Sequence, residues 1–209
     1  MAAEFPPEQD MITLYHSPNT RSSSIVWLLE ELRVPYETKL VTFRRADGTG
    51  EKDAANPHPH GKVPALEDNG ETVFESCAIG LFLTDKYRKA PLGPAVGESK
   101  RGEFLSWLFY RPGIMEPAFI ERRLEIKHIQ GMMGWAAPDE VEAVINDHLS
   151  KNKYFLGDEF STVDVLLGGG IHFMMLFGMT AKTPALEAYA ARITSRPAFK
   201  RAAERDAAK

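Results

Sequence analysis

The chain has 209 residues, of which 44% are hydrophobic and 26% are charged, an ordinary composition for a globular protein. Its formal net charge is −4, from 25 Lys and Arg against 29 Asp and Glu, which argues against a nucleic-acid-binding protein because such a protein normally presents a basic face. No run of about 18 apolar residues is present, so neither a transmembrane helix nor a membrane partner is expected. The length suits one large domain or two small ones.

The N-terminal segment and the cysteine content bear on where the protein works. Residues 1–10 contain two glutamates and lack the basic start and apolar core of a signal peptide, so a short disordered lead-in is expected. Cys77 is the single cysteine, which excludes an internal disulfide and a cysteine-based zinc site. A reducing, cytoplasmic setting is the simplest inference. No metal site is expected, because His58 and His60 stand in a proline-rich loop with too few ligands around them.

Residues 11–90 carry the pattern of a small α/β domain. A β-prone run is followed by a polar turn and by apolar residues at helical spacing, as at the start of a βαβ unit. The tripeptide Asp-Asn-Gly at 68–70 is a strong hairpin signal and predicts an antiparallel pair around it. The predicted elements, in chain order, are a strand at 11–15, a helix at 25–32, strands at 36–43, 62–66 and 71–75, and a helix at 76–87.

The rest of the chain has the pattern of a helical domain. Residues 91–98 contain two prolines and two glycines and form a predicted linker. No strand signal follows it, so an all-helical domain is expected over 99–209. Ser161 and Asp164 make a capping-box-like helix start, worth on the order of 1 kcal/mol to folding. Helices are predicted at 100–111, resuming after an interruption at Pro112-Gly113 up to 131, and at 138–149, 162–179, 184–194 and 197–207.

Hydroxyl and amide side chains gather between the first strand and the first helix, in residues 17–24. A helix N-terminus offers unpaired N–H groups and a partial positive charge, so this turn can stabilise an anion such as a thiolate. Lowering a thiol pKa from about 8.5 to about 6.5 takes roughly 2.7 kcal/mol. The helix end supplies about 0.3–1 kcal/mol and a hydrogen bond to a charged group about 1.5–3 kcal/mol, so the two together suffice. The alternative is that these residues only cap the helix.

Two further segments have the chemistry to hold a peptide ligand. If the Val63-Pro64 bond is cis, the Val63 N–H and C=O pair with a peptide like an added strand; otherwise Pro64 only marks an edge strand. Ser76 is a natural N-cap, and its hydroxyl with the N–H groups that follow suits a carboxylate. Glu75 beside it suits an ammonium group, so the pair matches an α-amino acid, which carries both charges. A plain helix cap is again the alternative.

Taken in order and spacing, these segments resemble the cytosolic glutathione transferases, in particular bacterial members with a Ser, Thr or Asn in the active-site turn. The resemblance runs from Met11 to about Lys200. Each motif is weak by itself, and their order makes the match specific. The residues that carry it are Leu14-Tyr15 with the 17–24 turn, Trp27-Leu28-Leu29-Glu30-Glu31-Leu32, Asn56-Pro57 with 61–66, Phe74-Glu75-Ser76-Cys77-Ala78-Ile79, and Phe155-Leu156-Gly157-Asp158 with 160–164.

The resemblance implies an α/β thioredoxin-like N-terminal domain that binds glutathione, followed by an all-α C-terminal domain. Glutathione is then the co-substrate, a small apolar electrophile is the second substrate, and the usual assembly is a homodimer, with no metal. The Val63-Pro64 bond is expected to be cis and to pair with the cysteinyl backbone. Glu75 and Ser76 are expected to hold the γ-glutamyl end, and Lys62 to lie near the glycine carboxylate.

The family's activating residue is a Tyr, Ser or Cys near the first turn. Tyr15 lies in the strand, and no Cys stands near Arg21, the place of the thiol in the Cys-type classes, which argues against a cysteine-based glutathionylating enzyme. The resemblance therefore points to the hydroxyl of Thr20, with Arg21 as electrostatic help and a glutathione contact. The other candidates around the thiol are Asn19, Ser17 and Ser22, and the second substrate is expected against the helix that carries Trp107, Tyr110 and Met115.

Three functions are compatible with these residues. The leading hypothesis is a transferase that ionises the glutathione thiol and conjugates it to an apolar electrophile. The second is a glutathione-dependent disulfide or peroxide reductase of the same fold. The third is a non-catalytic binding module that carries apolar ligands or a protein partner.

Overall fold

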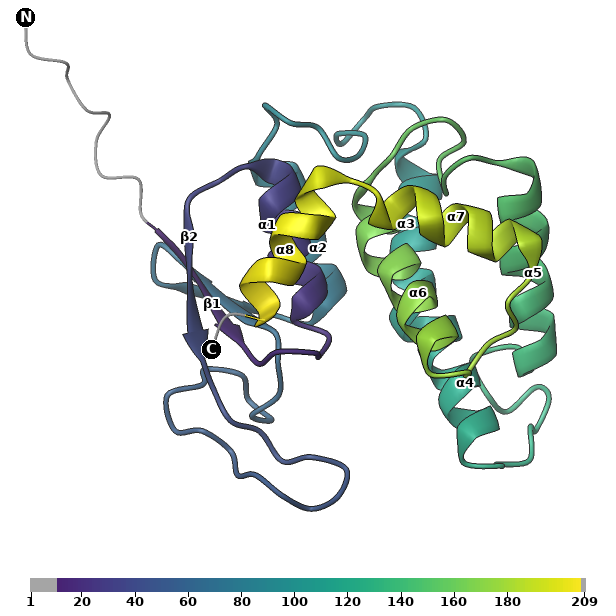
Figure 1. Ribbon diagram of the computed structural model, residues 1–209, viewed down its shortest axis with the longest axis horizontal. Helices are drawn as coiled ribbons and strands as arrows, with labels where there is room; N and C mark the ends of the chain where they lie inside the picture. Colours follow the sequence, from purple (N-terminus) through teal and green to yellow (C-terminus); the bar gives the residue numbers. More distant parts are fainter. Residues whose placement is uncertain (1–10, 208–209) are drawn as a thin grey trace, which may run out of the picture.

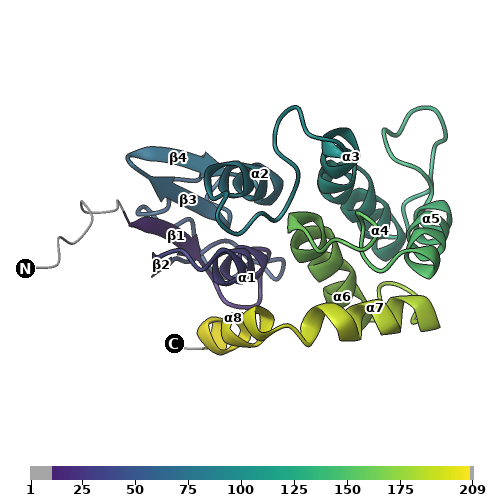
Figure 2. The same ribbon diagram turned by 90° about the horizontal axis from the view of Figure 1, so that it is seen from above.

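The computed structural model describes residues 11–207, so the lead-in expected at 1–10 lies outside the described residues. The molecule has two lobes, one built on a sheet and one made of helices (Figure 1). In the first lobe, α1 and α2 lie between the sheet and the helical lobe (Figure 2). No helix within 11–207 is both long and apolar enough to span a membrane.

The sheet has four strands in the order β2-β1-β3-β4. Strand β1 runs parallel to β2 and antiparallel to β3, and β3 is antiparallel to β4. The predicted hairpin is present, with Asn69 and Gly70 both at positive φ between its two strands. The strands are β1 (Ile12–His16), β2 (Tyr36–Leu40), β3 (Ala65–Asp68) and β4 (Glu71–Phe74), so β2 ends three residues before the predicted limit and β3 begins three residues after it.

Helices α1 (Ser23–Leu32) and α2 (Ser76–Lys86) bury apolar side chains against this sheet and against the second lobe. A Cβ built on Gly80 of α2 would lie 2.5 Å from Cδ1 of Leu166 in the helical lobe. One built on Gly169 would lie 3.4 Å from the Trp27 ring of α1. The two lobes therefore meet closely at α1 and α2, where glycine leaves the room that a methyl group would fill.

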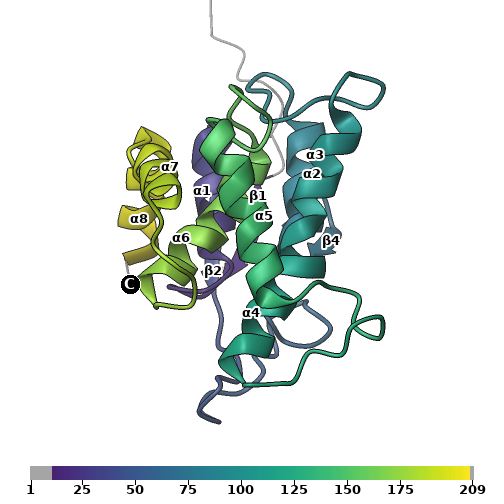
Figure 3. The same cartoon turned by 90° about the vertical axis from the view of Figure 1, so that its right-hand side faces the viewer.

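The helical lobe corrects one prediction about its first helix. Pro112 and Gly113 do not interrupt it, because a π-helical turn, η1 (Arg111–Met115), carries the helix from α3 (Arg101–Tyr110) into α4 (Glu116–Arg123). Such a turn widens the helix and accommodates a proline, which has no N–H to donate. The continuation ends at Arg123 and not at 131. The remaining elements of this lobe are α5 (Pro138–Lys151), η2 (Asp164–Gly168), α6 (Gly169–Leu176) and α7 (Pro184–Thr194) (Figure 3).

The capping box before η2 forms as predicted. The Ser161 N–H donates to Asp164 Oδ2 at 2.9 Å, and the Val163 N–H donates to Ser161 Oγ at 3.2 Å. Oδ1 of the same carboxylate accepts from the Tyr189 hydroxyl at 2.9 Å. Asp164 is fully buried, so this box ties η2 to α7 inside the core.

The last helix, α8 (Pro197–Ala207), lies against α1 of the first lobe, although it ends the chain (Figures 1 and 2). Arg201 Nε donates to Glu30 Oε2 at 2.7 Å, and the Phe199 ring meets Trp27 edge-on at 5.0 Å between centroids. The chain thus returns from the helical lobe and supports α1, the helix that follows the turn with Thr20.

Candidate active site

The turn between β1 and α1 is held together by its own hydroxyl groups. Thr20 Oγ1 lies 2.7 Å from both Ser17 O and Ser22 Oγ, and its single hydrogen can be donated to either. Ser22 Oγ lies 3.1 Å from the same carbonyl oxygen, and it accepts from the Ser17 N–H at 3.2 Å. Ser22 is fully buried, whereas Thr20 is only half-buried. Thr20 is therefore the hydroxyl of this pair that a ligand can reach.

The other residues expected around the thiol have different parts in this turn. Ser17 and Ser22 were predicted to lie around the thiol. They are 6% and 0% exposed, so their side chains fix the position of Thr20 from inside the turn. Asn19 is exposed at φ 57°, a left-handed conformation that asparagine tolerates, and its N–H donates to Asp206 Oδ2 at 3.0 Å. The turn is thereby tied to α8.

Arg21 points to the helical lobe. Its Nε lies 2.8 Å from Glu116 Oε2, and Arg111 Nε lies 2.8 Å from Oε1 of the same carboxylate. Burial acts to raise the pKa of Glu116, but Arg111 and Arg21 outweigh it and lower that pKa. The Arg21 Nε therefore joins the turn to α4 through an ion pair, and the expected contact of Arg21 with glutathione stays a prediction.

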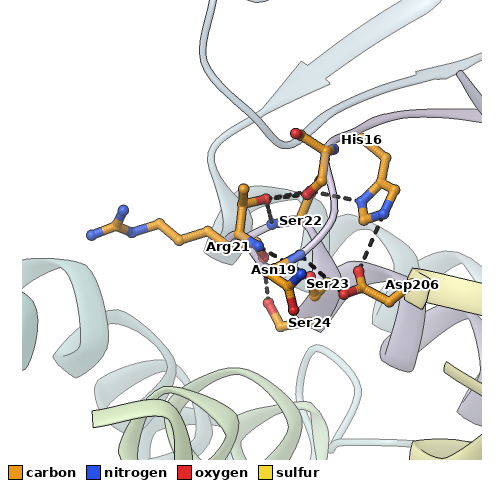
Figure 4. Close-up of polar contacts among 9 residues, drawn as sticks. His16, Asn19, Arg21, Ser22, Ser23, Ser24 and Asp206 are labelled. Atoms are coloured by element: carbon orange, nitrogen blue, oxygen red, sulfur yellow. Dashed lines mark hydrogen bonds and ion pairs between the residues drawn. The ribbon is translucent and has the colours of Figure 1, made fainter. Parts of the chain in front are cut away.

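A buried network behind the turn was missed in the sequence. His16 Nδ1 lies 2.8 Å from Ser22 Oγ, and His16 Nε2 lies 3.2 Å from Asp206 Oδ1 (Figure 4). His16 is the last residue of β1, and Asp206 comes from α8 at the other end of the chain. No local pattern could join them, since only the packing of α8 on α1 brings the two side chains together.

The Val63-Pro64 peptide bond is cis, which confirms the expectation. It precedes β3, an inner strand of the sheet, so Pro64 does not mark an edge strand. Asn56 Nδ2 donates to Lys62 O at 2.9 Å and holds the backbone just before the bond. The Lys62 residue is exposed, and within 11–207 it forms no ion pair.

The start of α2 differs from the prediction by one residue. Glu75, and not Ser76, is the N-cap, and Ser76 is the first helical residue. Glu75 adopts φ 72°, which is uncommon for a residue other than glycine and clusters at functional sites. Its side chain is 68% exposed and makes no capping bond, so the first N–H groups of α2 stay available to an outside acceptor.

The sheet register brings these segments together. Tyr15 at the end of β1 is opposite Ala65 at the start of β3, and Ala65 is opposite Phe74 at the end of β4. Three segments therefore lie at the same end of the sheet: the turn with Thr20, the Val63-Pro64 bond and the Glu75-Ser76 pair. Neighbouring strands are about 4.8 Å apart, so the outer two of the three strand ends are separated by roughly 10 Å.

Two other groups are unsuited to activate a thiol. The Tyr15 hydroxyl donates to Glu67 Oε2 at 2.5 Å, and that hydrogen bond, with burial, raises the pKa of Tyr15 to about 12. Burial also raises the pKa of Cys77 to about 12, and its Sγ donates to Leu108 O at 3.2 Å. Cys77 is therefore a buried and unreactive thiol, as predicted.

The three residues expected to hold the second substrate do not form one pocket. The Trp107 ring lies 4.6 Å from His148 of α5 and 5.2 Å from Tyr110 between centroids, so Trp107 packs between α5 and Tyr110. Met115 is fully buried, 3.0 Å from where a Cβ on Gly170 would stand. Trp107 instead lines a surface hollow of about 410 Å³ with residues of α5.

A different apolar surface continues from the turn. Glu116, which binds Arg21, is followed at four-residue intervals by Ile120 and Leu124, and residues four apart share one face of a helix. Ile120 and Leu124 are 42% and 63% exposed. Ile120 of α4 and Leu124, the C-cap of α4, therefore form an exposed apolar stripe that begins one helical turn after Glu116.

Comparison with known proteins gives the family. A model described as "Glutathione S-transferase, N-terminal domain" matches residues 11–85, and one described as "Glutathione S-transferase, C-terminal domain" matches residues 137–197. Glutathione S-transferase 3 of Schizosaccharomyces pombe is 33% identical over 175 residues, which are 74% of this chain and 70% of that protein. The chain belongs to the glutathione S-transferase family.

Other members of the family match over nearly the full length. Glutathione S-transferase GstB of Escherichia coli is 27% identical over 206 residues, 91% of this chain and 97% of that protein. A sphingomonad glutathione S-transferase, solved in complex with glutathione, has a TM-score of 0.73 and 28% identity, covering 94% of this chain and 100% of that one. A glutathione transferase from Methylococcus capsulatus shares the fold, with a TM-score of 0.76, 22% identity and coverage of 94% and 98%. The fold class is thus confirmed: a thioredoxin-like domain followed by a helical domain.

Proposed function

We propose that this glutathione S-transferase family member is a transferase that binds glutathione at the end of the sheet, ionises its thiol and conjugates it to an apolar electrophile. The sheet register is the observation that carries the proposal, because it gathers Thr20, Val63 and Glu75 within the length of one ligand. Three extended residues span about 10 Å, the separation of the outer two strand ends.

The proposed binding mode places one part of glutathione at each segment. The backbone of Val63 pairs with the cysteinyl residue as an added strand would. The γ-glutamyl end lies at Glu75 and Ser76, where the exposed carboxylate meets the ammonium group and the uncapped N–H groups of α2 meet the carboxylate. Lys62, exposed and without an ion-pair partner within 11–207, meets the glycine carboxylate.

Thr20 is the residue proposed to stabilise the thiolate. Unlike those of Ser17 and Ser22, its hydroxyl is only half-buried, and these two serines fix its position. A hydrogen bond to a charged acceptor supplies about 1.5–3 kcal/mol, and the start of α1 adds about 0.3–1 kcal/mol. Together they meet the roughly 2.7 kcal/mol needed to ionise the thiol near neutral pH.

The apolar substrate is placed against the stripe of Ile120 and Leu124, since α4 is joined to the turn through the ion pair of Arg21 and Glu116. We further expect a homodimer in the cytoplasm, and light scattering of the purified protein tests whether it is a dimer.

Turnover with an aryl halide supports conjugation, whereas turnover with only a peroxide or a disulfide supports the reductase. Glutathione binding without turnover on any of them supports the binding module.

Calorimetric titration of glutathione into the Glu75→Ala variant tests the binding mode. Loss of a charge-assisted contact of about 1.5–3 kcal/mol weakens binding by about 10- to 150-fold. Glu71→Ala is the matched control, because Glu71 is also exposed and lies at the opposite end of the same strand. Equal affinity of the Glu75→Ala variant and the wild type contradicts the proposed position of the γ-glutamyl end.

A further inference from the structure

His16 and Asp206 form a buried pair that the binding of glutathione does not use. His16 Nε2 and Asp206 Oδ1 lie 3.2 Å apart, and each is a buried atom without a well-aligned hydrogen bond within residues 11–207. A buried polar atom without a partner is costly and calls for a reason. Among residues 11–207, the two atoms face each other and form an ion-pair contact.

The carboxylate determines which ring nitrogen carries the proton. Asp206 Oδ2 accepts from the Asn19 N–H, and although burial acts to raise the pKa of Asp206, its contacts with His16, Ser23 and Asn19 lower it. An ionised carboxylate has no hydrogen to donate, so the hydrogen between the two residues belongs to His16 Nε2. In neutral His16, Nδ1 is then an acceptor, and Ser22 Oγ, 2.8 Å away, donates to it.

The same logic extends outwards to Thr20. Ser22 has one hydroxyl hydrogen, and since that hydrogen goes to His16, its oxygen accepts from Thr20 Oγ1 at 2.7 Å. A continuous chain of hydrogen bonds thus runs from the half-buried Thr20 through the buried Ser22 to His16, and His16 Nε2 is in ion-pair contact with Asp206 Oδ1 (Figure 4 shows its inner part). Ser17 O, 2.7 Å from Thr20 Oγ1 and 3.1 Å from Ser22 Oγ, is the alternative acceptor for both hydroxyl hydrogens.

We propose that this chain is a proton relay, in which His16 takes up the proton that the glutathione thiol loses and Asp206 holds the resulting imidazolium. This rests on the proposed function, which places the thiol at Thr20. The sulfur gives its proton to Thr20 Oγ1, Thr20 passes its own to Ser22 Oγ, and Ser22 passes its own to His16 Nδ1. The products are a thiolate and an imidazolium, and nothing is oxidised or reduced.

After the transfer, every hydrogen bond in the chain is reversed. His16 Nδ1 donates to Ser22, Ser22 donates to Thr20, and Thr20 donates to the thiolate, which is the contact that stabilises it. An imidazolium buried at His16 is unfavourable alone, but beside the Asp206 carboxylate the pair carries no net charge. His16 and Asp206 are therefore positioning residues that act through Thr20.

The test is the apparent pKa of the bound glutathione thiol, followed by the ultraviolet absorbance of the thiolate as pH is raised. We expect Asp206→Asn to raise this pKa by about one unit. For a wild-type thiol pKa of about 6.5, this lowers kcat/KM for an aryl halide by about threefold at pH 7, and by close to tenfold well below pH 6. Activity should recover at high pH, where the thiol ionises without the relay. Affinity for S-methylglutathione, which has no thiol, should not change.

Two further variants separate the relay from a structural role. Glu204→Gln removes the same charge from an exposed position of α8 and should leave the thiol pKa unchanged. In a double-mutant cycle, Ser22→Ala should add little to Asp206→Asn, because either change already interrupts the chain. If Asp206 only tethers α8, Asp206→Asn weakens S-methylglutathione binding or lowers the Tm while the thiol pKa stays at the wild-type value, and that result overturns the relay. A wild-type protein that binds neither glutathione nor S-methylglutathione contradicts the proposed function itself.

Discussion

The two ends of the proposed glutathione site are built in different ways. Glu75 and Ser76 are consecutive residues at a strand–helix junction, and Glu75 is exposed while Ser76 is half-buried. Thr20 instead depends on distant parts of the chain, since its turn is tied to α8 through Asp206 and to α4 through Glu116. The proposed γ-glutamyl end therefore depends on local structure, whereas the proposed thiol end depends on how α4 and α8 pack against the turn.

The largest effect is expected where α4 meets the turn. Glu116→Gln removes the partner of Arg111, whose side chain is 6% exposed, and leaves a buried charge uncompensated. Breaking such a pair costs about 3–5 kcal/mol, and the lower end applies here because Arg111 keeps its bond to Leu166 O. Urea unfolding measures this cost, with Glu103→Gln, at an exposed position of α3, as the control. Equal stability of the two variants contradicts the dependence of the turn on α4.

The same ion pair predicts a pH dependence. The pKa of Glu116 is lower in the folded protein than its ordinary value of 4.5, since Arg111 and Arg21 outweigh the effect of burial. Its contribution to stability is therefore complete above that ordinary value and is lost as pH falls through the lower, folded-state pKa. Unfolding measured from neutral to acid pH should show the gap between wild type and Glu116→Gln closing as pH falls. A constant gap contradicts the assignment.

A somewhat smaller effect is expected at the thiol end itself. Thr20→Ala removes the hydrogen bond to the thiolate, worth about 1.5–3 kcal/mol, so kcat/KM should fall by about 10- to 150-fold. Thr20→Ser keeps the hydroxyl and should retain most of the activity. Steady-state kinetics with an aryl halide measures both variants, and full activity of Thr20→Ala would show that another group contacts the sulfur.

The smallest effect concerns the contact between the lobes. Gly80→Ala places a methyl group 2.5 Å from Leu166 Cδ1 and should lower the free energy of unfolding by about 1–3 kcal/mol. Gly102→Ala, on α3, is the matched control, because no atom lies within 4 Å of its added Cβ, and it should stabilise the helix by up to about 1 kcal/mol. Denaturation of both variants measures the difference, and loss of stability in neither would show that Leu166 moves aside freely.

How much of the molecule could be predicted depends on how local each feature is. The hairpin at Asn69-Gly70 and the capping box at Ser161 and Asp164 follow from neighbouring residues, and both are present. The pairing of His16 with Asp206 could not be predicted, because it requires α8 to pack on α1. Local chemistry therefore predicts the turns and caps, and the network behind the thiol site depends on tertiary packing.

The side-chain directions of the predicted second-substrate residues could not be predicted for a related reason. The helix that carries Trp107 and Tyr110 has large apolar side chains around its whole circumference, so the sequence does not show which face meets which neighbour. The π-turn that follows shifts the helical phase and buries Met115. The orientation of these side chains therefore follows from packing and not from spacing.

Calorimetric titration of glutathione into Thr20→Ala and Glu75→Ala, side by side, tests the central claim most directly. If the start of α2 provides the affinity and the turn with Thr20 provides thiol activation, Glu75→Ala loses most of its affinity for glutathione. Thr20→Ala then binds glutathione about as tightly as the wild type. Equal losses in both variants, or a loss confined to Thr20→Ala, would contradict this division between the two ends of the site.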